Sequence, residues 1–187
     1  MADAHAFALA AVLGAMLVER GVEVRMSRPR EALAVAAGAR AVRPDGFAGI
    51  VAVHALFFLG MAAEGALAPW ARLGSWTAPA LVVAAGAEAL RWWSIHTLGP
   101  RWNVRVLVHP DTPLVADGPY RWTRHPNYVA VAVLLVAVPA AFGCWATAGA
   151  MLVLHPLALW RRVRIEDAAL AGASAVPPAG PTFTSRG

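Results

Sequence analysis

The sequence predicts an all-α membrane protein with about five transmembrane helices, and three observations lead to this fold class. Hydrophobic residues make up 59% of the 187 residues and charged residues only 14%, whereas a soluble domain carries about 25% charged residues. Apolar runs of helical length alternate with turns that contain glycine and proline. The basic residues are all arginines and gather between these runs, as the positive-inside rule describes for membrane proteins.

The N-terminal part of the chain divides into a span and a surface segment. Residues 4–19 form an apolar run that is short for a span, because about 20 residues are needed to cross a bilayer. Residues 20–43 hold six arginines and two glutamates. Within them, the alanine-rich stretch 29–40 begins with Pro-Arg-Glu, which predicts a separate short helix on the membrane surface.

Four further helices are expected, over residues 47–67, 76–98, 126–141 and 145–170. Gly99-Pro100 ends the second of these, proline at position 126 suits a first turn, and Gly143 marks a tight reversal. Residues 101–125 are polar, with an extended stretch over 104–108 and turns at 109–111 and 117–119. Residues 1–170 should form one domain, with its catalytic half at about 92–170, and residues 171–187 a disordered tail.

The arginines predict the orientation in the membrane. With the N-terminus outside, segments 20–45, 99–125 and the C-terminus share one side and hold 14 of the 16 arginines. That side should face the cytoplasm, in a bacterial cytoplasmic membrane. The net charge is +5, but the arginines flank apolar segments and form no continuous basic stripe. This placement disfavours a nucleic-acid-binding function. The single cysteine, Cys144, excludes an intrachain disulfide, and no obligatory protein partner is expected.

Several ionisable residues fall inside the expected spans, where such groups are costly and usually face the interior. They are His54, Glu64, Glu88, His96 and His155. Glu88 precedes Arg91 by three residues and should pair with it. Glu64 should lie near the outer surface with no role of its own. The histidines lack carboxylate-rich spacing, so no metal site is expected.

Two polar clusters should meet at the cytoplasmic end of the protein. Segment 118–128 opens the helix over 126–141, and segment 161–167 lies near the end of the last helix. Because the reversal at Gly143 makes these two helices antiparallel neighbours, the clusters come together. Arg162 and Glu166 stand four residues apart and share one helix face.

The residues of this meeting point suit a zwitterionic ligand with a cationic centre. Arg124 and His125 at a helix N-terminus favour an anionic group such as a carboxylate. Glu166 and Asp167 favour a cation, and Tyr128 offers an aromatic face. S-adenosylmethionine combines a carboxylate, an ammonium, an adenine and a sulfonium, so the residues alone suggest this ligand.

The two clusters also resemble the motifs of a known family. The run Gly118-Pro119-Tyr120-Arg121 … Arg124-His125-Pro126-Asn127-Tyr128 resembles the signature of the isoprenylcysteine carboxyl methyltransferase family, which shares an Arg-His-Pro-x-Tyr core with phospholipid methyltransferases. Downstream, Arg162-x-x-x-Glu166-Asp167-x-x-Leu170 resembles the family's Arg-x-x-x-Glu-Glu-x-x-Leu. The resemblance covers about residues 92–170, including Thr97-Leu98-Gly99-x-x-Trp102. It implies an integral membrane enzyme that uses S-adenosylmethionine and methylates a lipid-like acceptor entering from the bilayer.

The resemblance further implies which residues form the site. The cofactor would contact Tyr120, Arg124, His125, Pro126, Tyr128, Glu166 and Asp167. The acceptor would contact Trp93, His96 and Trp102, and the catalytic residues would be Arg162, Glu166 and His155. Arg162 would hold an acceptor carboxylate by two hydrogen bonds. A phenol, with a pKa of about 10, would instead need a base, for which His125, His155 and Glu166 are the candidates.

Three positions depart from the family pattern. Ala130 stands in place of a glycine, Asp167 in place of the second glutamate, and His155 in place of an asparagine that lies near the acceptor in the family. His155 leaves two acceptors open: a prenylcysteine-type carboxylate, or the phenolic or pyrone lipids that similar bacterial members are thought to methylate. Two other functions also remain open, a non-enzymatic small membrane protein and a membrane reductase with a nicotinamide pocket.

Overall fold

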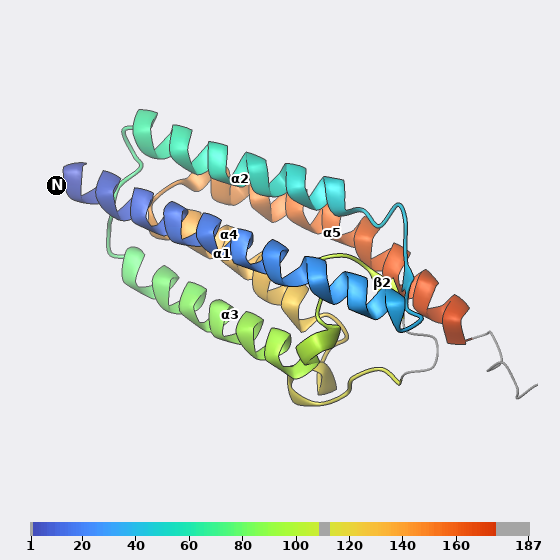
Figure 1. Cartoon of the computed structure of the whole chain (residues 1–187). Coiled ribbons are helices and arrows are strands. Elements are labelled where there is room, and N and C mark those ends of the chain that lie inside the picture. The colour runs from blue at the N-terminus through green and yellow to red at the C-terminus, as the bar shows by residue number, and fades with distance from the viewer. Residues whose placement is uncertain (1, 109–112, 175–187) are drawn as a thin grey trace, which may run out of the picture.

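The protein consists mainly of five long α-helices, which a computed structural model describes for residues 2–108 and 113–174 (Figure 1). The helices are α1 (Ala2–Ala36), α2 (Phe47–Leu67), α3 (Thr77–Leu98), α4 (Pro126–Ala141) and α5 (Trp145–Ser174). Two 3-10 helices, η1 (Gly99–Arg101) and η2 (Gly118–Arg121), and two short strands, β1 (Arg40–Ala41) and β2 (Leu107–Val108), connect them. The predicted helical architecture is therefore confirmed.

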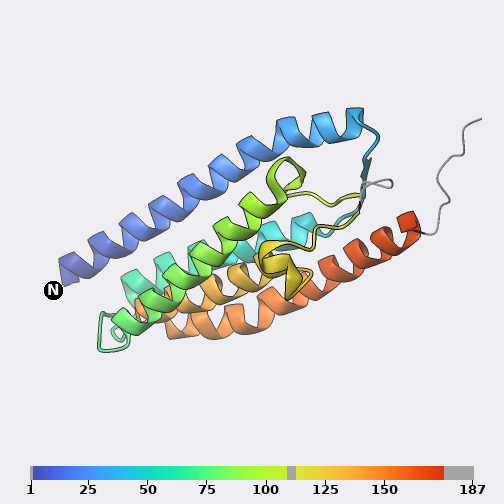
Figure 2. The same ribbon diagram turned by 90° about the horizontal axis from the view of Figure 1, so that it is seen from below.

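The helices run side by side along one long axis (Figures 1 and 2). Helix α3 packs on α4, α4 on α5 and α5 on α2, while α1 lies along one side and contacts chiefly α2. Large buried side chains such as Phe57, Met61, Leu135 and Met151 fill the space between them. The connecting segments η1, β2 and η2 all lie at one end of the bundle, here called the loop end.

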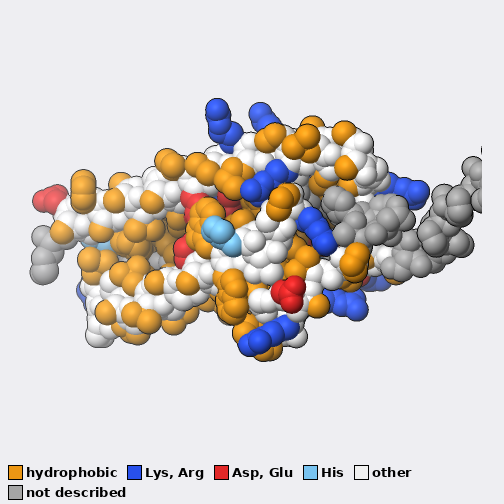
Figure 3. All heavy atoms as spheres, turned by 60° about the horizontal axis from the view of Figure 1, so that its bottom comes forward, with side chains coloured by type: hydrophobic (Ala, Val, Ile, Leu, Met, Phe, Trp, Pro, Cys, Tyr) orange, Lys and Arg blue, Asp and Glu red, His pale blue; other side chains and the backbone are white. Residues whose placement is uncertain are grey.

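The surface of the bundle is unusually apolar. Large hydrophobic side chains such as Leu59, Val82 and Leu152 are more than half exposed, and contiguous apolar surface of this kind marks contact with lipid or another protein. By length and composition, α2 is the one helix in the described residues that could cross a membrane, and α4 is apolar but has only 16 residues. Arginine side chains gather toward the loop end in Figure 3. The count of five spans and their orientation stay predictions.

The first helix corrects one prediction. Residues 4–19 and 29–40 do not form two helices, because α1 runs without interruption from Ala2 to Ala36 through Pro29. Proline removes one backbone hydrogen bond, yet contacts on both sides of it hold the helix in place. Ser27 donates a hydrogen bond to Asn103 Oδ1 (2.7 Å), and the Arg30 guanidinium lies over the Trp102 ring (5.9 Å). Tertiary contacts thus override the local stop signal.

The other predicted boundaries agree closely with the structure. The ranges 47–67 and 126–141 match α2 and α4, and α3 starts one residue later than expected. Helix α5 continues to Ser174, so residues 171–174 are helical rather than part of a tail, and the rest of that predicted tail lies outside the described residues. Part of the expected extended stretch forms β2, which pairs antiparallel with β1. The predicted turn at 109–111 also lies outside the described residues.

Two glycines shape the connections that position the site. Gly143 has φ +70°, and a Cβ there would lie 2.8 Å from the backbone oxygen of Arg72, so glycine allows the tight α4–α5 reversal. Gly118 has φ +55°, and a Cβ there would lie 2.7 Å from Thr97 Oγ1. This glycine lets η2 lie directly against α3.

Candidate functional site

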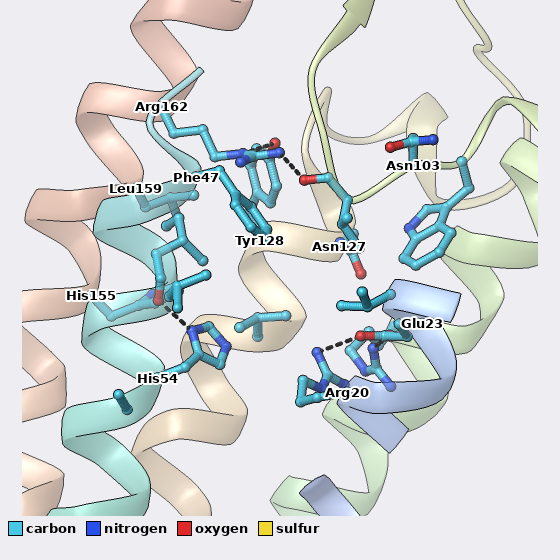
Figure 4. A pocket seen from close by; sticks show the side chains of 18 of the residues that line it. Arg20, Glu23, Phe47, His54, Asn103, Asn127, Tyr128, His155, Leu159 and Arg162 are labelled. Carbon is cyan, nitrogen blue, oxygen red and sulfur yellow. Dashed lines mark hydrogen bonds and ion pairs between the residues drawn. The ribbon is translucent and has the colours of Figure 1, made fainter. Parts of the chain in front are cut away.

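The two polar clusters meet as the sequence predicted, and Tyr128 joins them. The Tyr128 hydroxyl donates a hydrogen bond to Glu166 Oε2 (2.7 Å) and accepts one from Arg162 Nε (2.9 Å). Arg162 and Glu166 therefore do not pair directly, although they share one face of α5. The phenol stands between the cation and the carboxylate, and Figure 4 shows the Arg162 side of this arrangement.

Beyond Tyr128, on the side of Glu166, lies a group of residues we call the mouth cluster: Tyr120, His125, Glu166 and Asp167. The imidazole of His125 stacks on the Tyr128 ring, with centroids 5.1 Å apart and planes at 9°. Its Nε2 lies 3.5 Å from Asp167 Oδ1. Both atoms are buried and have no hydrogen-bond partner among the described residues. Burial, and then the negative charge of Glu166, raise the pKa of the Tyr120 hydroxyl.

On the other side of Tyr128 lies a partly open cavity of about 320 Å³, lined by residues of all five α-helices and of the segment that follows η1 (Figure 4). Its walls are largely apolar, with Phe47, Val51, Phe58, Trp102, Val131 and Leu159 among the lining residues. Arg162 and Tyr128 line it toward the loop end. The other polar side chains on the wall are His54 and His155 on one side, Arg20, Glu23 and Arg91 on the other, and Asn103 and Asn127 near the loop end. The buried Oδ1 of Asn127 has no hydrogen-bond partner among the described residues.

Arg162 is buried in this wall, with only 5% of its surface exposed. Besides its bond to Tyr128, its Nη2 donates to the backbone oxygen of Val104 (2.6 Å). Within the described residues no carboxylate lies at ion-pair distance from its guanidinium. The cavity thus contains a buried cation whose charge is met by dipoles alone.

The two cavity histidines face each other from different helices. His54 comes from α2 and His155 from α5, and their ring centroids are 6.1 Å apart in an edge-on arrangement. His54 Nδ1 donates to the backbone oxygen of Ile50 (2.8 Å). His155 is 2% exposed, and its Nδ1 has no hydrogen-bond partner among the described residues. Sequence reasoning placed both residues inside the membrane but did not pair them.

A third polar group, here called the Arg91 cluster, joins α1 to α3. Arg91 pairs with Glu88 on its own helix (2.9 Å), as the sequence predicted, and also with Glu19 and Glu23 of α1. Acidic side chains are visible in the hollow between α1 and α3 in Figure 3. The sequence reading missed Glu19 and Glu23. Their spacing of four residues puts both carboxylates on one helix face, and this signal could have revealed a partner on another helix.

The remaining predicted site residues lie in different surroundings. Pro126 is buried and opens α4, Trp102 lines the cavity, and Arg124 is exposed. Trp93 and His96 lie on the exposed face of α3, outside the cavity lining. Trp93 packs on Trp122, and His96 Nδ1 donates to the backbone oxygen of Trp92 (2.8 Å). Their part in acceptor binding stays a prediction.

The fold and this site define a helical protein with a membrane-compatible helix, a largely apolar cavity and a polar cluster adjoining it at the loop end. Residues 80–172, from α3 to the end of α5, match the model of the isoprenylcysteine carboxyl methyltransferase (ICMT) family. The chain is also 30% identical over 159 residues to the uncharacterized protein YpbQ of Bacillus subtilis (strain 168), which covers 85% of this chain and 94% of the relative.

This protein belongs to the ICMT family. The family implies a membrane-associated methyltransferase that depends on S-adenosylmethionine. A comparison with solved structures found no match.

Proposed function

We propose that this protein is an S-adenosylmethionine-dependent O-methyltransferase that acts on a lipid-like acceptor held in the cavity. The observation that carries the proposal is the position of the Tyr128 hydroxyl, which bonds Arg162 on the cavity side and Glu166 on the side of the mouth cluster. The two regions are thus separated by a single side chain. A donor in the mouth cluster and an acceptor in the cavity would adjoin each other at this residue.

The mouth cluster fits the chemical groups of S-adenosylmethionine. Its carboxylates, Glu166 and Asp167, suit the ammonium, and the uncapped N-terminus of α4 suits the carboxylate. The buried Nε2 of His125 and Oδ1 of Asp167 have no hydrogen-bond partner among the described residues, and such atoms are costly unless a ligand satisfies them. The cofactor would supply an electrophilic methyl group, and the residues of the cluster would hold and orient it.

The cavity supplies what an acceptor oxygen requires. Its largely apolar walls suit a hydrophobic body, which would displace water from the site when bound. The guanidinium of Arg162 has five N–H donors, and its bonds to Tyr128 and Val104 use only some of them. The remaining donors would hold the acceptor oxygen, and the buried positive charge would stabilise it as an anion. The acceptor is a carboxylate or an acidic hydroxyl on this proposal.

Cofactor binding is tested by calorimetry on the full chain in lipid nanodiscs. S-adenosylhomocysteine should bind to the wild-type protein, and NADPH should not. The variants His125→Ala and Glu166→Ala should abolish binding, whereas Arg164→Ala, an exposed change on the same helix, should leave it unchanged. The proposal is wrong if the wild-type protein fails to bind S-adenosylhomocysteine, or if both cluster variants bind it normally.

The acceptor is tested with methyl-labelled S-adenosylmethionine and a native lipid extract. A labelled lipid should form with wild-type protein and not with the His125→Ala variant. Label released by alkali would identify a methyl ester and therefore a carboxylate acceptor, and alkali-stable label would identify a methyl ether and therefore a hydroxyl acceptor.

A further inference from the structure

The cavity contains a second set of polar atoms that the transfer step proposed above does not use. His54 and His155 lie on its wall from α2 and α5, and Figure 4 shows the His54 ring turned into the space between the helices. His155 occupies the same face of α5 as Leu159 and Arg162, at intervals of four and three residues. Seven residues separate His155 from Arg162, which is about 10 Å along the helix axis.

In the pair of His54 and His155, each ring has one nitrogen that can still form a hydrogen bond with a ligand. Because His54 Nδ1 donates to the backbone oxygen of Ile50, a neutral His54 has Nε2 as a bare acceptor. His155 has a buried Nδ1 without a hydrogen-bond partner among the described residues. One ring can therefore accept a hydrogen bond while the other donates one. A hydroxyl group, which both donates and accepts, complements such a pair.

Among the described residues, no other polar side chain of the wall is hydrogen-bonded to these nitrogens. The carboxylates of the opposite wall belong to the Arg91 cluster, where Glu23 binds both Arg20 (2.8 Å) and Arg91, and the Asn127 amide oxygen is also without a described partner. The lining residues near the histidines, Val51, Phe58 and Val131, are apolar. Buried polar atoms in such surroundings are costly when they lack a partner. His155 is 2% exposed, so its Nδ1 is shielded from bulk water.

We infer that His54 and His155 form a subsite for a hydroxyl group on the acceptor, about two helical turns from the oxygen that Arg162 holds. This inference rests on the proposed function, because it takes the cavity as the acceptor site. It narrows the acceptor to an apolar molecule with two oxygen functions at opposite ends of a body about 10 Å long. One oxygen would be methylated, and the other would be bound between the two imidazoles.

A matched pair of rigid probes tests the subsite without the cofactor. In 4,4′-dihydroxybiphenyl the two oxygens lie at opposite ends of the molecule, a similar distance apart, and 4-hydroxybiphenyl lacks the second hydroxyl. Binding to the full chain in nanodiscs is measured by calorimetry, with empty nanodiscs as the reference for partitioning into lipid. The dihydroxy probe should bind about ten-fold more tightly, the value of one satisfied buried hydrogen bond. Phenylhydroquinone, with both hydroxyls on one ring, should lose that advantage.

Substitutions of the two histidines test whether they cause the tighter binding of the dihydroxy probe. His54→Leu and His155→Leu should each bring the affinities for the two biphenyl probes to within about two-fold of each other. His155→Asn, which keeps a donor and an acceptor, should retain part of the preference. His5→Gln is the control, since His5 is a buried histidine that bonds Phe142 far from the cavity, and it should keep the full preference.

A nuclear magnetic resonance measurement on the wild-type protein tests the subsite even if the leucine variants do not fold. In wild-type protein labelled with ¹⁵N in its histidine rings, the dihydroxy probe should shift the resonances that His54→Asn and His155→Asn remove. Equal affinity of the wild-type protein for the two biphenyl probes would overturn the inference. It would mean that the second hydroxyl binds to the histidine pair no better than water does. A preference that survives in both leucine variants would overturn it too. Failure of S-adenosylhomocysteine to bind would instead count against the proposed function alone.

Discussion

Two arginines are buried in the wall of the same cavity, and their surroundings differ. Arg91 is 1% exposed and Arg162 is 5% exposed. Arg91 pairs with three carboxylates, from Glu19, Glu23 and Glu88. Arg162 has only a phenol hydroxyl and a backbone carbonyl as described partners.

We interpret this difference as one between a structural charge, Arg91, and a charge that we propose binds a ligand, Arg162. A buried charge is costly, and the fold normally compensates it with an opposite charge. The Arg91 cluster is compensated within the protein, and it joins α1 to α3. Arg162 lacks that compensation, and the nearby mouth cluster also has buried atoms without hydrogen-bond partners. We therefore expect ligands to bind at Arg162 and at the mouth cluster.

The largest effect on stability should come from removing the charge of Arg91. Arg91→Leu removes the buried cation that Glu19, Glu23 and Glu88 share, and leaves Arg20 to pair with Glu19 and Glu23. Breaking a buried pair in this way costs about 3–5 kcal/mol. We expect the free energy of unfolding to fall by that amount, measured by denaturant titration of the protein in mixed micelles. Substituting the carboxylates as well, in Glu19→Gln/Glu23→Gln/Arg91→Leu, should recover part of the loss. An Arg91→Leu variant as stable as the wild type would show that the cluster does not hold α1.

Arg162→Leu should affect activity more than stability. Methyl transfer should fall about 100-fold, a typical loss for one donor that stabilises a developing anion. S-adenosylhomocysteine should bind within two-fold of wild type, because the mouth cluster is intact. Arg161→Leu, at the exposed neighbouring position, is the matched control and should keep full activity. If the Arg162 variant transfers methyl groups normally, the comparison between the two arginines is mistaken.

Tyr128→Phe should have a smaller effect, because it removes only the link between the two regions. Its ring can still stack on His125, while Arg162 and Glu166 each lose one hydrogen bond. We expect turnover to fall about ten-fold or somewhat more, since both lost hydrogen bonds involve charged groups. Steady-state kinetics with the acceptor identified from the lipid extract would measure this. An unchanged rate would mean that Tyr128 separates the two regions without helping to position either.

The sequence revealed most of the fold and the mouth cluster because both depend on local signals. Helix limits followed from apolar runs and from Gly99-Pro100, Pro126 and Gly143, and one reversal was enough to bring residues 118–128 beside 161–167. The rest depends on contacts between distant helices. Nothing local indicates that Ser27 anchors α1 across Pro29, or that His54 faces His155. The spacing of Glu19 and Glu23 indicates a partner on another helix, but not that this partner is Arg91.

Glu64 corrects a sequence expectation and should give the smallest effect. It was expected to have no role, but its carboxylate accepts hydrogen bonds from the backbone N–H groups of Ala146 (2.9 Å) and Thr147 (2.8 Å), from the Thr147 hydroxyl and from Trp70 Nε1. It therefore caps the N-terminus of α5, where a negative charge also interacts favourably with the helix dipole.

Glu64→Ala should lower the free energy of unfolding by about 1 kcal/mol, as the loss of a helix cap does. Glu64→Gln should cost less, because one carbonyl oxygen remains to accept a bond. Thermal unfolding followed by circular dichroism would measure both. Methyl transfer and S-adenosylhomocysteine binding should be unchanged below the unfolding temperature, since the cap lies at the start of α5, whereas Arg162 and Glu166, which we propose act in binding and transfer, lie nearer its other end. A loss of transfer in a folded Glu64→Ala protein would show that α5 transmits changes from the cap to the site, and that a satisfied carboxylate does not by itself identify a purely structural group.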